Sequence, residues 1–87
     1  KLDVLGALLM TGATMTLLDV ALSVAARCDP CVGYHAKALV ELGASRAQVA
    51  EALGMAVYMG GGPSLMYAAK ASAAFDEFSQ LSAQATA

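Results

Sequence analysis

The chain has little charge and no concentration of basic residues. Only five of its 87 residues are Lys or Arg, they are spread along the chain, and the formal net charge is −2 at pH 7. Binding to nucleic acid or to an anionic membrane surface requires a basic patch, which this sequence does not supply. We therefore expect neither as a partner.

Strand patterns are also absent from the sequence. No stretch alternates apolar and polar residues as a half-buried strand does, whereas apolar residues recur at helical spacing throughout. We predict an all-helical fold in a single domain spanning residues 1–87. Hydrophobic residues make up 59% of the chain. Because a monomer this small cannot easily hide so much apolar surface, we expect a homo-oligomer.

Membrane-spanning and targeting segments are not evident either. The longest uncharged stretch, residues 52–69, is interrupted by three consecutive glycines and Pro63, so it predicts two helices and not a membrane span. The first residues lack the cleavage-site pattern of a signal peptide. A cysteine pair that cycles between dithiol and disulfide suits a reducing compartment, so we expect a cytoplasmic protein.

Helix-end signals divide the chain into about five predicted helices. The pair Thr11 and Gly12 ends the first helix, and Gly43 suits the left-handed position after the third. Ser45 and Gln48 form a capping box before the fourth. The predicted helices are residues 2–10, a segment capped by Thr14 or Thr16 that runs to Arg27, residues 30–42, residues 46–59, and a last helix from Pro63 to about Leu81.

Both cysteines and the single histidine lie in one short motif, C-x-x-C-x-x-x-H, at residues 28–35. Asp29 is predicted as the N-cap of a helix and Pro30 as its first residue, which puts Cys31 in the first turn. A helix N-terminus favours an anion, so the thiolate of Cys31 should be stabilised. His35 lies one turn further on the same face, where its imidazole can accept the thiol proton.

Cys28 is the natural resolving thiol, because a spacing of three residues lets its sulfur meet an oxidised Cys31 in a short disulfide loop. The pair is therefore interpreted as a dithiol that cycles. A structural zinc site needs four ligands, and no second Cys/His cluster completes the shell, so we expect no metal and no cofactor. A purely structural disulfide would close too small a loop to stabilise the fold much. His35 by itself would also fit a satisfied core histidine.

The glycine run before Pro63 invites comparison with a phosphate-binding loop. No strand precedes the run and no G-K-[ST] follows it, so a tight connection between two packed helices is favoured. Three methionines near this run, Met55, Met59 and Met66, are predicted to fill gaps in the core or to lie in a subunit contact.

Two segments, ARCDPCVGYHAKALVELGAS and AQVAEALGMAVYMGGGPSLMYAAKA, together resemble the carboxymuconolactone decarboxylase-like superfamily, and within it the alkylhydroperoxidase D-like branch. The resemblance covers residues 17–78. It implies an orthogonal helical bundle that assembles as a dimer, trimer or hexamer. It also implies a thiol peroxidase that reduces hydroperoxides and is re-reduced by a dithiol or lipoyl protein.

The same resemblance implies roles for individual residues. Cys31 corresponds to the peroxide-attacking cysteine, Cys28 to its resolving partner and His35 to the relay histidine. The family pattern has a glutamate twelve residues before the first cysteine, where this chain has Thr16, and a hydroxyl cannot act as a carboxylate base near neutral pH. Asp19, about one helical turn further on, is the candidate replacement relay; alternatively, it is a surface aspartate paired with a basic group.

The sequence is compatible with three candidate functions. The first is the peroxidase just described. The second is a non-catalytic or redox-sensing oligomeric module, in which the cysteine pair changes subunit packing without useful turnover. The third, ranked lower, is decarboxylation of a carboxymuconolactone-type ring. That reaction would leave the cysteine pair idle, and the only basic residues in view for a dicarboxylate are Arg27, Lys37 and Arg46.

Overall fold

The computed structural model describes residues 4–86, with their side chains from residue 12 to residue 85. Within that range the chain forms four helices and no strand: α1 (Val4–Ala26), α2 (Asp29–Glu41), α3 (Arg46–Gly60) and α4 (Gly62–Thr86). The prediction of an all-helical fold is confirmed. The number of helices is four and not five.

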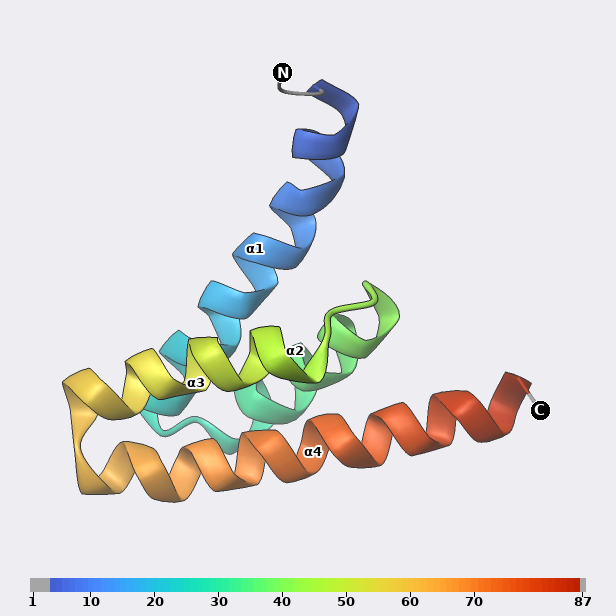
Figure 1. The fold of residues 1–87 in the computed structure, drawn as a ribbon. Helices are drawn as coiled ribbons and strands as arrows, with labels where there is room; N and C mark the ends of the chain where they lie inside the picture. The colour runs from blue at the N-terminus through green and yellow to red at the C-terminus, as the bar shows by residue number, and fades with distance from the viewer. Residues whose placement is uncertain (1–3, 87) are drawn as a thin grey trace.

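Helices α2 and α3 each pack against both α1 and α4, and α1 also contacts α4. Figure 1 shows α3 lying alongside α4, with α1 crossing them steeply. The first half of α1 and the last turns of α4 extend beyond the other helices in this view. The second half of α1 is therefore the part that enters the packed core and faces α2.

The predicted first and second helices are a single continuous helix, α1. Gly12 does not end a helix, and neither Thr14 nor Thr16 caps one; the Thr16 hydroxyl instead donates a hydrogen bond to the Gly12 carbonyl, 2.9 Å away in the same helix. An interior glycine costs about 1 kcal/mol in a helix. That penalty is too small to break α1, whose second half is anchored by the fully buried Val20 and Val24.

Several other helix ends follow the predicted signals, whereas α4 continues to Thr86, past its predicted end near Leu81. The Ser45 hydroxyl accepts a hydrogen bond from the Gln48 N–H (3.1 Å), and the Gln48 side chain accepts one from the Ser45 N–H (2.9 Å), so the capping box before α3 is confirmed. Gly43, with φ 78°, takes the left-handed position after α2 as predicted. Gly61, with φ 72°, is the one residue between α3 and α4, which confirms a tight connection there.

The core is built from small and branched side chains contributed by all four helices. Leu39 of α2 and Val24 of α1 are fully buried. On α4, Ala68, Ala71 and Phe75 face inward, whereas Leu65 of the same helix is 58% exposed. The complete buried cluster is Val20, Val24, Val32, Leu39, Val49, Leu53, Ala56, Ala68, Ala71 and Phe75.

Several large apolar side chains lie outside this core. The three methionines predicted as core-filling or subunit-contact residues, Met55, Met59 and Met66, are 61%, 78% and 69% exposed, so the core-filling alternative is wrong for this subunit. Leu18 and Leu22 of α1 are also exposed. A role in a subunit contact stays a prediction.

The longest uncharged stretch, residues 52–69, divides between α3 and α4 at Gly61, as its glycine run predicts. Within residues 4–86, no helix has both the length and the apolar character needed to cross a bilayer.

Candidate dithiol site

Cys28 and Cys31 are joined by a disulfide, with their Cα atoms 5.2 Å apart. Cys28 is the residue that caps α2: its backbone is extended (φ −106°, ψ 99°) and its sulfur accepts a hydrogen bond from the Cys31 N–H at 3.3 Å. Cys31 therefore lies in the first turn of α2, as expected. Cys28 and Cys31 are both partly exposed, so solutes can approach them.

Asp29 is not the N-cap that the sequence predicted, because the sulfur of Cys28 takes that role and shifts the helix start by one residue. Asp29 becomes the first helical residue, with Pro30 second. The Asp29 carboxylate instead accepts a hydrogen bond and ion pair from Lys70 of α4, with 3.1 Å between Nζ and Oδ1. The Lys70 ammonium also lies 4.7 Å from the centre of the Tyr67 ring.

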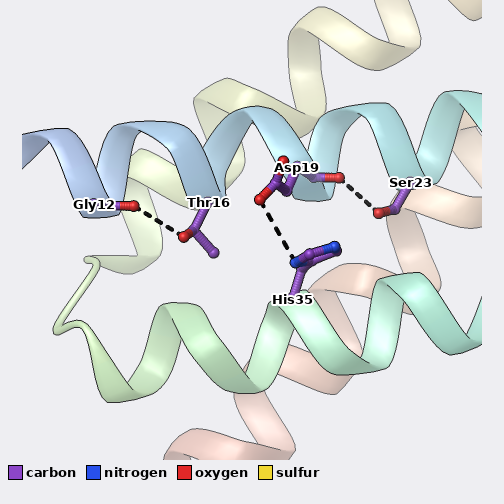
Figure 2. A network of polar contacts seen from close by, with 5 residues as sticks. All are labelled: Gly12, Thr16, Asp19, Ser23 and His35. Atoms are coloured by element: carbon purple, nitrogen blue, oxygen red, sulfur yellow. Dashed lines mark hydrogen bonds and ion pairs between the residues drawn. The ribbon is translucent and has the colours of Figure 1, made fainter.

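Asp19 and His35 meet where α1 faces α2. The Oδ2 atom of Asp19 lies 3.8 Å from the Nδ1 atom of His35, an ion-pair distance that is longer than a hydrogen bond. Figure 2 shows the two side chains pointing toward each other from neighbouring helices. The His35 side chain is 25% exposed and that of Asp19 44%, so the pair is open to solvent and to small reactants.

Two further contacts involve the residues of this pair. The Ser23 hydroxyl donates a short hydrogen bond of 2.6 Å to the backbone carbonyl of Asp19. The ring of Tyr34 packs edge-on against the ring of His35, with 5.2 Å between the ring centres. Tyr34 is itself 73% exposed.

Thr16 lies one turn before Asp19 on α1, at the position where the resembled family has a glutamate. Its hydroxyl hydrogen is committed to the Gly12 carbonyl, and Figure 2 shows this contact within α1. No hydrogen bond joins Thr16 to His35 in the described part of the chain, and a hydroxyl does not supply a carboxylate. Of the two α1 residues considered for the relay, Asp19 is the one that lies against the imidazole.

No hydrogen bond joins the His35 ring to either sulfur in the described part of the chain. With both sulfurs bonded to each other, neither carries a proton that the imidazole could accept. The structure thus brings together Asp19 with His35 and, separately, Cys28 with Cys31. The four residues share the first two turns of α2 and the facing part of α1.

Neither of two cavities found on the described surface is lined by a cysteine. One, of about 340 Å³, lies between the ends of α1 and α3 and the start of α4, and Arg27 is part of its wall. The other, of about 380 Å³, lies between α2 and the second half of α4, beside Lys37 and Phe78. For residues 12–85, no three His, Cys, Asp or Glu side chains cluster closely enough to hold a metal ion.

Sequence reasoning missed the Asp29–Lys70 pair and the position of Arg27 on a cavity wall. Asp29 and Lys70 are separated by 41 residues, and no local pattern indicates that they meet. Arg27 carried no signal beyond its positive charge.

Comparison with known proteins places these features in a family context. The model of the carboxymuconolactone decarboxylase family matches residues 10–74. An uncharacterized protein of Cupriavidus necator is 45% identical over 67 residues, which cover 77% of this chain and 59% of that protein.

A solved structure is also similar. The crystal structure of a carboxymuconolactone decarboxylase family protein from Legionella pneumophila, in its apo form, superimposes with a TM-score of 0.76 at 58% identity. The match covers 77% of this chain and 60% of the Legionella chain. The present chain thus spans about three fifths of the length of both proteins.

Proposed function

This chain belongs to the carboxymuconolactone decarboxylase family, and from its Cys28–Cys31 disulfide we propose that it is a thiol-dependent peroxidase of the alkylhydroperoxidase D-like type. The observation that carries the proposal is the placement of this pair at the N-terminus of α2, with His35 one turn further on. Redox-active cysteines are typically found at helix N-termini, where the helix dipole favours the thiolate.

The reaction has three steps. The Cys31 thiolate attacks the terminal oxygen of ROOH, the O–O bond breaks, and the products are a Cys31 sulfenic acid and, after one proton is taken up, ROH. The Cys28 thiol then attacks the Cys31 sulfur, which forms the disulfide and releases water. An external dithiol, or a lipoyl protein in its dihydro form, donates two electrons and two protons to restore both thiols.

His35 and Asp19 supply the proton transfers in this proposal. Imidazole suits the task because it accepts and releases protons near neutral pH. The Asp19 carboxylate, 3.8 Å from Nδ1, orients the ring and replaces the glutamate that the family pattern has at position 16. Recycling by thiol reductants fits a cytoplasmic setting, and the exposed apolar side chains fit a homo-oligomer.

The test is a peroxidase assay of the reduced protein with tert-butyl hydroperoxide and dihydrolipoamide as reductant. We expect wild-type turnover, no peroxide consumption above background by Cys31→Ser, and consumption of one equivalent per chain by Cys28→Ser in the absence of added thiol. The Cys28→Ser protein should accumulate a Cys31 sulfenic acid, which dimedone traps as a mass adduct. Equal turnover by wild type and Cys31→Ser would overturn the proposal.

A control separates loss of chemistry from loss of fold. Ser72→Ala changes a half-buried hydroxyl on α4 and leaves the cysteine motif intact. It should match wild type in turnover and in circular dichroism. The cysteine variants should match wild type only in circular dichroism.

A second candidate function is a redox-sensing module without useful turnover. The observation that favours it is Thr16, which replaces a carboxylate and whose hydroxyl is used within its own helix. A sensor predicts a change of oligomer size between the reduced and oxidised protein, measured by light scattering on a sizing column. A peroxidase predicts turnover whether or not the size changes, so the two measurements discriminate between these functions.

A further inference from the structure

The residue that follows the end of helix α1 is an arginine in a backbone conformation that usually requires glycine. Arg27 has φ 58°, in the left-handed region, and is the only non-glycine residue with positive φ in the described chain. The Arg27 N–H bonds to the Val24 carbonyl and the Cys28 N–H bonds to the Ser23 carbonyl, both at 3.1 Å. These two bonds define a Schellman motif, in which the left-handed position is usually glycine.

Helix α2 ends with the same pair of bonds and the usual residue. The Gly43 N–H bonds to the Val40 carbonyl at 3.1 Å, and the Ala44 N–H bonds to the Leu39 carbonyl at 3.0 Å, with Gly43 left-handed. The chain therefore uses glycine at one helix end and arginine at the equivalent place of another. Because a β-carbon is disfavoured in this conformation, the backbone does not explain the arginine.

The Arg27 guanidinium also has no acidic partner in the described chain. The ion pairs of residues 12–85 join His35 to Asp19, Arg46 to Asp76 and Lys70 to Asp29, and none includes Arg27. A guanidinium offers several N–H donors in a planar arrangement that suits two carboxylate oxygens. Arg27 is thus an unpaired carboxylate-binding group at the edge of a cavity.

The rest of that cavity is almost entirely apolar. Its one buried polar side chain is Ser64, which is 4% exposed. A β-carbon at Gly60 would overlap the Ser64 side chain, so the glycine is what lets Ser64 take this place. The apolar part of the wall consists of Ala21, Leu22, Ala25, Met55, Ala56, Met59 and Pro63.

From these observations we propose that the cavity between α1, α3 and α4 binds an organic carboxylate with an apolar body. Arg27 pairs with the carboxylate, the Ser64 hydroxyl is a second donor, and the flexible side chains of Met55 and Met59 cover the apolar body. A volume of about 340 Å³ accommodates a chain of medium length. The cavity wall contains no cysteine, but Arg27 directly precedes Cys28. Resting on the proposed function, a carboxylate-bearing hydroperoxide is therefore the substrate class to test at this site.

The binding claim does not depend on peroxidase activity, and its test is made on the oxidised protein without turnover. Octanoate is titrated into 15N-labelled full chain, with 1-octanol and octylamine as the uncharged and cationic counterparts. We expect millimolar binding, with amide shifts centred on Arg27, Gly60 and Ser64. Octanoate should bind roughly tenfold more tightly than octanol, the contribution of one charge-assisted contact. Octylamine should bind more weakly than either.

Arg27→Gly is the informative variant, because glycine fits the left-handed backbone and the fold should be retained. We expect it to bind octanoate roughly tenfold more weakly, at the level of octanol. Lys37→Gln removes one positive charge from the other cavity and should leave octanoate binding unchanged. The proposal is overturned if wild type does not distinguish octanoate from octanol, if Arg27→Gly keeps that distinction, or if the shifts centre on Lys37.

If the binding test succeeds and peroxidase turnover is absent, the site stands and the proposed function fails. If turnover is present and octanoate does not bind, the reverse holds. A positive result in both assays predicts that a carboxylate-bearing hydroperoxide has a lower KM than its methyl ester in wild type. In Arg27→Gly the two KM values should be equal.

Discussion

His35 of α2 is faced by the carboxylate of Asp19 on α1, with 3.8 Å between Nδ1 and Oδ2. This contact crosses between two helices that meet only in the folded protein. It places an acid beside the one histidine of the chain, three residues beyond the position at which the family pattern has its glutamate. The contact makes Asp19 a testable part of the proposed proton relay.

Replacing Asp19 by Asn should lower kcat/KM for hydroperoxide by roughly tenfold or more, since proton transfer by a positioned side chain is worth about 10²-fold or more in total. The measurement is the peroxidase assay with the helix content followed by circular dichroism. Asp76→Asn is the matched control, because Asp76 has a similar exposure of 48% and pairs with Arg46 instead. Equal losses in the two variants would count against a relay role for Asp19.

Placing a glutamate at position 16 should recover turnover in the Asp19→Asn background. Thr16 and Asp19 lie one turn apart on α1, and a glutamate reaches further than an aspartate. The expected result is a kcat/KM for Thr16→Glu/Asp19→Asn several-fold above that of Asp19→Asn alone. Thr16→Gln in the same background adds length without charge and should give no recovery. Recovery by glutamine would show that the carboxylate is not what matters.

Reduction of the Cys28–Cys31 disulfide should cost little stability. The closed loop holds only a few residues, so the chain-entropy contribution is about 2 kcal/mol at most. Urea unfolding with and without dithiothreitol measures this difference, and Cys28→Ser/Cys31→Ser provides the permanently reduced comparison. A loss above about 4 kcal/mol would indicate a structural disulfide and weaken the case for a cycling pair.

Arg27 after α1 and Gly43 after α2 take the same left-handed position, and substitutions at the two residues should change the free energy of unfolding in opposite directions. Arg27→Gly should raise the free energy of unfolding by up to about 1 kcal/mol, because it removes a disfavoured β-carbon. Gly43→Ala should lower it by about 1 kcal/mol, since no atom lies within 4 Å to add any other cost. Chemical denaturation measures both changes. Destabilisation by Arg27→Gly would show that the arginine side chain supports the fold.

Two glycines of α3 should also differ. Gly60→Ala should destabilise the protein by about 1–3 kcal/mol, because its β-carbon would lie 2.9 Å from the Ser64 β-carbon and closer still to the hydroxyl oxygen. Gly54→Ala should stabilise it by about 0.5–1 kcal/mol, since nothing lies within 4 Å and alanine is the better helix former. Thermal unfolding of the pair tests this contrast. Equal effects of the two changes would contradict the close approach of Ser64 to Gly60.

Local signals in the sequence were sufficient for three of the four helices. The capping box at Ser45 and the left-handed glycine at Gly43 act over four or five residues, so their outcome does not depend on the rest of the fold. The join of the first two predicted helices into α1 was not predictable in that way. A threonine and a glycine weaken a helix locally, and packing of Val20 and Val24 against the other helices outweighs that cost.

The candidate site also has features that local sequence predicts and features that it does not. The relative placement of Cys28, Cys31 and His35 could be predicted from the sequence, because all three lie at the start of one helix. The helix start itself moved by one residue, since the sulfur of Cys28 serves as the cap and frees Asp29 to pair with Lys70. Asp29 and Lys70 are 41 residues apart, so no local sequence pattern predicts that they pair.

What the sequence by itself determined is the helical class, the helix ends set by their own caps, and a cysteine pair with a histidine one turn away. These features rest on interactions between near neighbours along the chain. Only the tertiary structure decided that Asp19 faces His35, that Lys70 holds Asp29, and that Arg27 lies unpaired on an apolar cavity. Such contacts form when the helices pack, and packing depends on the whole chain and not on any one segment.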